Sequence, residues 1–171
     1  LLYPDFPFVF PSGFDLISFL FVTGILFLSF LPHELMHKAV AQRYGLFAEF
    51  RIIPSYALLT LLTIFLPVFR IFAPGAVMIG GEARPGAYGK TAAAGPATNV
   101  AVGVVMLGLS FLLSSYANFF LLGIYLSGWL AFFNLIPIAP LDGEKILHWN
   151  KAVFSILLVA SLALFTYALF F

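Results

Sequence analysis

The sequence predicts an all-α polytopic membrane protein, a bundle of about four to six transmembrane or re-entrant helices with a short β-strand or hairpin between Ala76 and Gly81. Two observations support this fold class. Hydrophobic residues make up 63% of the 171-residue chain and charged residues only 9%, against roughly a quarter charged in ordinary soluble domains. Several apolar runs are also long enough to cross a bilayer. No polar stretch is large enough for a separate soluble module, so we expect residues 1–171 to form a single intramembrane domain.

The first predicted membrane helix covers residues 14–31, which are almost continuously apolar. As a helix this run would be about 27 Å long, most of the thickness of a hydrocarbon core. The pattern continues as a helix over residues 33–44, with Gly45 as a typical residue at a helix end. Pro32 lies between the two parts, so a kink or two shorter helices are both open.

Three further apolar runs, residues 92–115, 119–133 and 152–171, are predicted to be membrane helices. Residues 55–72 are also apolar but contain Pro67 and Arg70, so they could form a complete crossing or a bent, re-entrant pair.

Residues 75–89 are rich in glycine and form the main predicted non-helical segment. Within it, Ala76-Val77-Met78-Ile79 is typical of a short strand. The edge of such a strand could pair with an unwound substrate, since a helical substrate must become extended before hydrolysis; a purely structural hairpin is the alternative.

Charge and cysteine content exclude several classes of protein and site. The chain has no cysteine, so any metal must take nitrogen or oxygen ligands. A net charge of +1 with scattered basic residues gives no footprint for nucleic acid. The apolar composition indicates that the chain lies in a lipid bilayer. The sequence predicts no particular oligomeric state.

The pentapeptide His33-Glu34-Leu35-Met36-His37 carries the strongest chemical signal. Its two imidazoles, at i and i+4 on one helical face, can share a zinc ion, and Glu34 is close enough to activate a water molecule there. The alternative is an accidental match. It would leave ionisable groups buried in hydrocarbon, at a cost of at least about 2.5 kcal/mol each, which a bound metal would remove.

A catalytic zinc needs a third protein ligand. Asp142 stands out because it ends the segment from Asn134, where Pro137 and Pro140 interrupt regular helix; irregular backbone at membrane depth indicates a protein-lined cavity. His148 could also approach the site, although its neighbours Trp149 and Lys151 favour an interfacial anchor. The full set of candidates is Glu49, Glu82, Asp142, Glu144 and His148.

Three motifs together resemble the site-2 protease family of intramembrane metalloproteases, in its minimal archaeal and bacterial form. They are His33-Glu34-x-x-His37, Gly95-Pro96-x-x-Asn99, and Asn134-x-x-Pro137 leading to Leu141-Asp142-Gly143. The resemblance covers about residues 20–147. Departures from the family pattern are Met36 and Glu144, where glycine is common, and Pro32 directly before the first histidine.

The resemblance implies one zinc ion per chain, held by His33, His37 and Asp142, with Glu34 as the general base. It also implies that Asn134 positions the substrate or stabilises an oxyanion.

Asn99, Val77 and Pro137 are expected to line the substrate cavity. For Asn99, a satisfied asparagine in a close contact between helices is an equally good interpretation.

The site also constrains the topology. Lys38, Arg43 and Arg51 follow His37, so the positive-inside bias places this end of the first helix, and with it the active site, nearer the cytoplasm. Asp142 must reach the same depth, so residues 55–89 must begin and end on one side. We therefore expect a re-entrant hairpin or an interfacial pair over residues 55–72.

The function predicted from these features is that of an intramembrane zinc metalloendopeptidase, which cuts a peptide bond within or near the transmembrane segment of a membrane-protein substrate. The alternatives are a membrane protease of the prenyl-protein-processing type and a non-catalytic, metal-containing binding or scaffold protein.

Overall fold

The computed structural model describes residues 16–55, 58, 62, 75–82 and 86–171. These residues form five α-helices, a short 3-10 turn and a two-stranded sheet. The elements are α1 (Leu16–Arg43), β1 (Phe47–Ile52), β2 (Gly75–Gly80), α3 (Ala87–Leu112), η1 (Ser114–Tyr116), α4 (Ala117–Asn134), α5 (Asp142–Trp149) and α6 (Lys151–Phe170).

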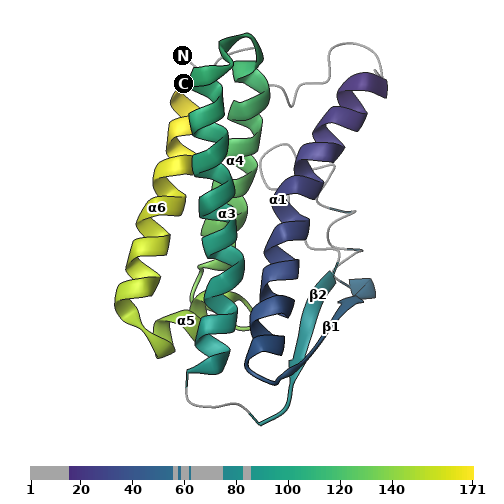
Figure 1. Cartoon of the computed structure of the whole chain (residues 1–171), viewed down its shortest axis with the longest axis vertical. Coiled ribbons are helices and arrows are strands. Elements are labelled where there is room, and N and C mark those ends of the chain that lie inside the picture. Colours follow the sequence, from purple (N-terminus) through teal and green to yellow (C-terminus); the bar gives the residue numbers. More distant parts are fainter. Residues whose placement is uncertain (1–15, 56–57, 59–61, 63–74, 83–85) are drawn as a thin grey trace.

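The four long helices α1, α3, α4 and α6 lie side by side and alternate in direction along the chain (Figure 1). The short helix α5 and the strands β1 and β2 lie at one end of this bundle, where α1 ends and α3 begins (Figure 1). The predicted fold class is therefore confirmed: the protein is a helical bundle with one small antiparallel hairpin.

Three helical segments, Ala87–Leu112, Ser114–Asn134 and Lys151–Phe170, are long and apolar enough to cross a membrane. They match the predicted helices to within a few residues at most ends. Their outer faces are apolar and exposed, which soluble proteins avoid over such an area. Exposed side chains on these faces include Val105, Phe111, Leu112, Ile156 and Val159. The protein is therefore a membrane protein.

Helix α1 is continuous through Pro32. The 28-residue helix ends at Arg43, nearly two turns after His37, and Gly45, with a positive φ of 74°, then reverses the chain into β1. The possibility of two shorter helices meeting at Pro32 is wrong. A single proline removes one backbone hydrogen bond, and the packing of α1 against α3 and α4 along the bundle outweighs that loss.

The hairpin pairs the predicted strand, β2, with β1, a strand that the sequence analysis did not predict. The two are antiparallel, with Phe50 opposite Val77 and Ile52 opposite Gly75. The chain therefore leaves the sheet at Ile52 and re-enters it directly alongside at Gly75. This agrees with the expected return of the intervening segment to the side it left. The prediction of a re-entrant or interfacial pair over residues 55–72 falls, apart from residues 55, 58 and 62, outside the described residues.

Glycines set the distance between helices on the side of the bundle away from the hairpin. A Cβ atom added to Gly128 of α4 would lie 2.7 Å from the backbone nitrogen of Phe165 on α6, so these two helices touch backbone to backbone. Gly103 of α3 makes a similar approach to the side chain of Leu164. Small residues at such positions let membrane helices pack closely.

We expect Gly128→Ala to destabilise the protein by roughly 1 to 3 kcal/mol, because the added methyl group would force α4 and α6 apart. The same substitution at Gly108 of α3 is the matched control, since a Cβ there would meet nothing within 4 Å. Reversible unfolding in detergent micelles measures both. Equal stability of the two variants would contradict this account of the α4 and α6 contact.

Candidate metal centre

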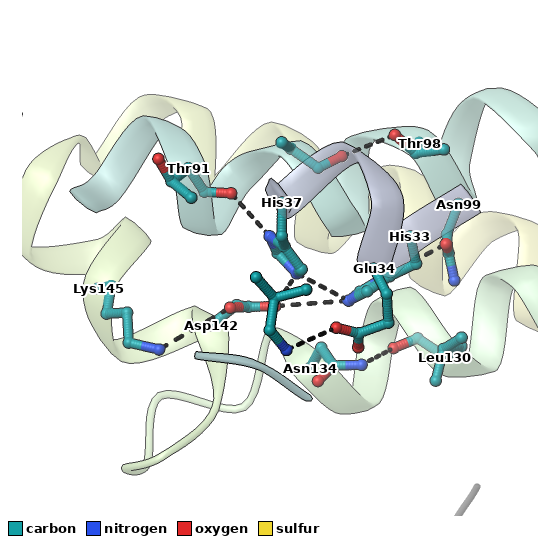
Figure 2. A network of polar contacts seen from close by, with 12 residues as sticks. His33, Glu34, His37, Thr91, Thr98, Asn99, Leu130, Asn134, Asp142 and Lys145 are labelled. Carbon is teal, nitrogen blue, oxygen red and sulfur yellow. Dashed lines mark hydrogen bonds and ion pairs between the residues drawn. The ribbon is translucent and has the colours of Figure 1, made fainter. Parts of the chain in front are cut away.

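Helix α1 supplies two buried histidines. His33 and His37 lie one turn apart, so both imidazoles project from the same face of the helix toward α3 and α5 (Figure 2). Their exposed fractions are 2% and 6%, and their Nε2 atoms lie 3.0 Å apart.

Asp142, the first residue of α5, lies against the two histidines. These three side chains, His33, His37 and Asp142, form the metal group. The Oδ2 atom of Asp142 lies 3.1 Å from Nε2 of His37 and 3.6 Å from Nε2 of His33. The loop between α4 and α5 folds back to bring it there. Gly143 makes this possible, because a Cβ at that position would lie 2.2 Å from the carbonyl oxygen of Leu135.

The spacing of these three atoms fits a zinc ion. Ligand bonds of about 2.0 to 2.2 Å in a tetrahedron place donor atoms about 3.3 to 3.5 Å apart, close to the observed 3.0, 3.1 and 3.6 Å. Two imidazoles and a carboxylate are also ligands that zinc accepts. Among the residues that the structure describes, these three form the one group of histidines and carboxylates that could hold a metal ion.

The other candidate ligands lie elsewhere. Glu49 pairs with Arg51 on the exposed face of β1, where Nη2 of Arg51 lies 2.8 Å from the carboxylate. His148 is exposed and its Nδ1 contacts the carbonyl oxygen of Glu144 at 2.8 Å. The neighbouring Trp149 packs against Gly89 of α3, where an added Cβ would lie 2.2 Å from the Cβ of the tryptophan.

Helix α3 closes the back of the group. Nδ1 of His33 lies 3.2 Å from Oδ1 of Asn99, and Nδ1 of His37 lies 2.7 Å from the carbonyl oxygen of Thr91 (Figure 2). Between them, Gly95 faces the imidazoles directly. A Cβ there would lie 2.3 Å from Nε2 of His37 and 2.6 Å from Nε2 of His33, in the space that a shared ion needs.

Glu34 lies beside the group without being part of it. Its carboxylate is 8% exposed, and Oε2 accepts a hydrogen bond of 3.1 Å from the backbone N–H of Val77 on β2 (Figure 2). This contact joins the hairpin to the helix that carries both histidines.

A cavity of about 440 Å³ opens in front of the metal group. Its walls come from α1, β2, the start of α3, α4, α5 and the loop before α5, and they are mostly apolar. The polar side chains that line it are His33, Glu34, His37, Asn134, Asp142 and Lys145, together with Ser29 and Tyr88.

Four further residues were predicted for the site, and two of them line the cavity. Asn134 ends α4 and lines the cavity, with Nδ2 donating to the carbonyl oxygen of Leu130 at 2.9 Å. Val77 also lines it. Asn99 is fully buried behind His33 and Pro137 is exposed, and neither belongs to the cavity lining. The arrangement of these two residues therefore differs from a place in the cavity lining, and for Asn99 it matches the alternative of a close contact between helices. The reason for Pro137 is that the loop turns outward after Leu135, and Pro140 and Leu141 line the cavity in its place.

Sequence reasoning missed three contributors: the carbonyl of Thr91, the N–H of Val77 and the side chain of Lys145, whose Nζ lies 4.0 Å from Oδ1 of Asp142. The first two are backbone groups, which leave no signal in a sequence. Lys145 is separated from Asp142 by one helical turn, and this i, i+3 spacing could have indicated it.

A buried His, His and Asp set with an adjacent glutamate, inside a bundle of membrane helices, defines a membrane metalloprotein with the groups of a metalloprotease. Comparison with known proteins agrees. The chain is 39% identical over 147 residues to a protein of Methanocaldococcus jannaschii named "Putative zinc metalloprotease MJ0611", an alignment that covers 82% of this chain and 76% of that protein. The chain belongs to the site-2 protease family of zinc metalloproteases.

A second relative is named "Putative zinc metalloprotease Rip3" and occurs in two strains of Mycobacterium tuberculosis. It is 33% identical over 138 residues, which cover 74% of this chain but only 30% of the relative. No protein-family model matches the chain. No solved structure matches it either.

We expect Gly95→Ala to abolish stoichiometric zinc binding, because the new methyl group would lie 2.3 and 2.6 Å from the two Nε2 atoms and would push the imidazoles out of place. Gly108→Ala on the same helix is the control, since its Cβ meets no other atom. Metal content of the purified proteins by mass spectrometry is the measurement. A Gly95→Ala protein that holds one zinc ion as tightly as the parent would rule out this placement of the ion.

Proposed function

We propose that this protein is an intramembrane zinc metalloendopeptidase that hydrolyses a peptide bond within or near a transmembrane segment of a membrane-protein substrate. The observation that carries the proposal is the convergence of His33, His37 and Asp142 at the spacing of zinc ligands, with Glu34 at the same cavity. The names of the relatives support a zinc metalloprotease.

His33, His37 and Asp142 would hold the zinc ion through Nε2, Nε2 and Oδ2. When bound, zinc lowers the pKa of water and polarises a carbonyl group. All three candidate ligands line the cavity, so a water molecule or a substrate carbonyl could reach an ion held by them, as a catalytic site requires.

Glu34 moves the proton in this proposal. Its carboxylate takes a proton from the attacking water as oxygen bonds to the carbonyl carbon, and it delivers that proton to the amine nitrogen as the C–N bond breaks. The N–H of Val77 holds Oε2, so that Oε1 is the oxygen left to carry the proton.

The cavity edge of β2 supports binding of an extended substrate. Val77 directs its N–H toward Glu34 and away from β1, so this edge of the strand faces the cavity. A peptide added along it would lie beside the metal group, and Asn134 on the opposite wall would position its carbonyl. A helical transmembrane substrate would have to unwind locally to bind in this way.

The proposed placement is multi-pass, with the site nearer the cytoplasm. The positive charges of Lys38, Arg43 and Lys90 lie at the end of the bundle that carries the hairpin and α5, as the positive-inside bias requires of a cytoplasmic end. Lys145 and Asp142 lie at this end of the cavity, where water could enter.

Glu34→Gln should keep zinc and lower cleavage by about 10² to 10⁴-fold, because it removes the proton acceptor and leaves all three ligands. Asp142→Asn should lose both zinc and cleavage. A single-span test substrate with metal analysis of each protein gives the result. Normal cleavage by Glu34→Gln would refute the mechanism, and a parent protein that binds zinc but cuts nothing would favour the scaffold alternative.

Val77→Pro tests the contact between the hairpin and Glu34. Proline removes the N–H that Glu34 accepts, and it is tolerated there because this N–H does not pair with β1. We expect unchanged zinc content and about tenfold slower cleavage. The lost hydrogen bond to a charged group is worth roughly 1.4 kcal/mol, which corresponds to a tenfold change in rate.

The matched variant Val77→Ala shortens the side chain but keeps the N–H, and it should cut at nearly the parent rate. If alanine and proline slowed cleavage equally, the side chain of Val77 rather than its N–H would be the important group.

A further inference from the structure

Each histidine of the metal group has its second ring nitrogen against an oxygen of α3. His33 faces Oδ1 of Asn99 at 3.2 Å, and His37 faces the carbonyl oxygen of Thr91 at 2.7 Å (Figure 2). An oxygen acceptor requires a donor, so Nδ1 carries the proton in both rings. In the neutral imidazoles, the nitrogens left with lone pairs are then the two Nε2 atoms, which lie 3.0 Å apart and beside the Asp142 carboxylate. Lone pairs at that distance repel each other, and a shared cation relieves the repulsion.

The three residues of α3 that face the two imidazoles lie on one face of the helix. Thr91, Gly95 and Asn99 follow each other at intervals of four residues, so they form a single line along α3. The outer two hold the rings from behind, and the glycine between them leaves the space in front of the Nε2 atoms open.

Because Asn99 is buried, its contact with His33 determines which ring nitrogen of His33 carries the proton. Both Asn99 and Thr91 have exposed fractions of 0%, so water cannot replace a lost partner. Nδ2 of Asn99 has no hydrogen-bond partner among the described residues. The amide therefore makes its one described side-chain hydrogen bond to the imidazole. A reversed amide would present an N–H to Nδ1 and force the proton of His33 onto Nε2, where zinc must bind.

We propose that Asn99 is a positioning residue of the metal centre, whose side-chain carbonyl holds His33 in the tautomer that leaves Nε2 free for zinc, while the carbonyl of Thr91 does the same for His37. This inference rests on the zinc site of the proposed function, but it concerns affinity for the metal and not the cleavage step. Partners of this kind typically change metal affinity by about 10 to 100-fold when removed.

The test compares Asn99→Leu, which has no acceptor, with Asn99→Asp, which keeps an oxygen acceptor in a side chain of almost the same shape. Zinc dissociation constants are measured without substrate, by competition with a chromophoric chelator in detergent. We expect Asn99→Leu to bind zinc about 10 to 100-fold more weakly and Asn99→Asp to bind it at least as tightly as the parent. Thr98→Val is the control, since Oγ1 of Thr98 bonds only to the carbonyl of Ala94 in its own helix, and it should not change the affinity.

Equal affinity of Asn99→Leu and the parent would overturn the proposal, as would an equal loss in the leucine and aspartate variants, which indicates packing alone. If Asn99→Leu fails to fold, Asn99→Asp decides: retained affinity supports the proposal, and a tenfold or greater loss overturns it. None of these outcomes depends on proteolysis, so the assay of Glu34→Gln tests the proposed function separately.

Discussion

The close approach of helix α1 to helix α3 at Gly95 is the contact on which the metal centre depends. The backbone of α3 comes so near the imidazoles of His33 and His37 that a Cβ atom at residue 95 would lie 2.3 and 2.6 Å from their Nε2 atoms. Because α3 is this close, its own oxygen atoms reach the back of both rings. The same helix receives α5, whose Trp149 lies on Gly89. One helix thus sets the position of both elements that carry the candidate ligands.

The hairpin depends on this arrangement in turn. With α1 fixed against α3, Glu34 projects toward the cavity and accepts the N–H of Val77, so β2 lies along the open side of the metal group. The register of β1 with β2 fixes which backbone groups of β2 face the cavity. Val77 of β2, Glu34 and the three candidate ligands therefore line one cavity. In the proposed function, this arrangement would align an extended peptide with the groups that cut it.

Buried polar groups are costly in a membrane protein unless they have partners. The described site satisfies nearly all of them internally: the histidines through α3, Glu34 through the hairpin, and Asn134 through its own helix. Ser29 of α1, which lines the same cavity, and Ser127 of α4, both buried, lie 3.1 Å apart and bond to each other. These buried polar groups thus have partners inside the protein, while the outer faces of the long helices are apolar.

The sequence by itself determined the helical membrane fold and the chemical identity of the site. Long apolar runs predict membrane helices. The i, i+4 spacing of His33 and His37 places both side chains on one face of a helix, independently of the tertiary structure. Asp142 could be singled out because the prolines around it break the helix at a depth where only a cavity tolerates irregular backbone. The return of the chain before α3 also followed, as a constraint from the depth of the ligands.

Only the tertiary structure determined which groups contact the candidate ligands and Glu34. Strand β1, the N–H of Val77 and the carbonyl of Thr91 act through backbone atoms, which any side chain would supply equally, so no pattern of residue types marks them. Asn99 was expected in the cavity and Pro137 as part of its lining, but the first lies behind His33 and the second faces outward. The direction in which a polar side chain points depends on how two helices are rotated against each other. That rotation is fixed by contacts such as the one at Gly95, between residues distant in the sequence.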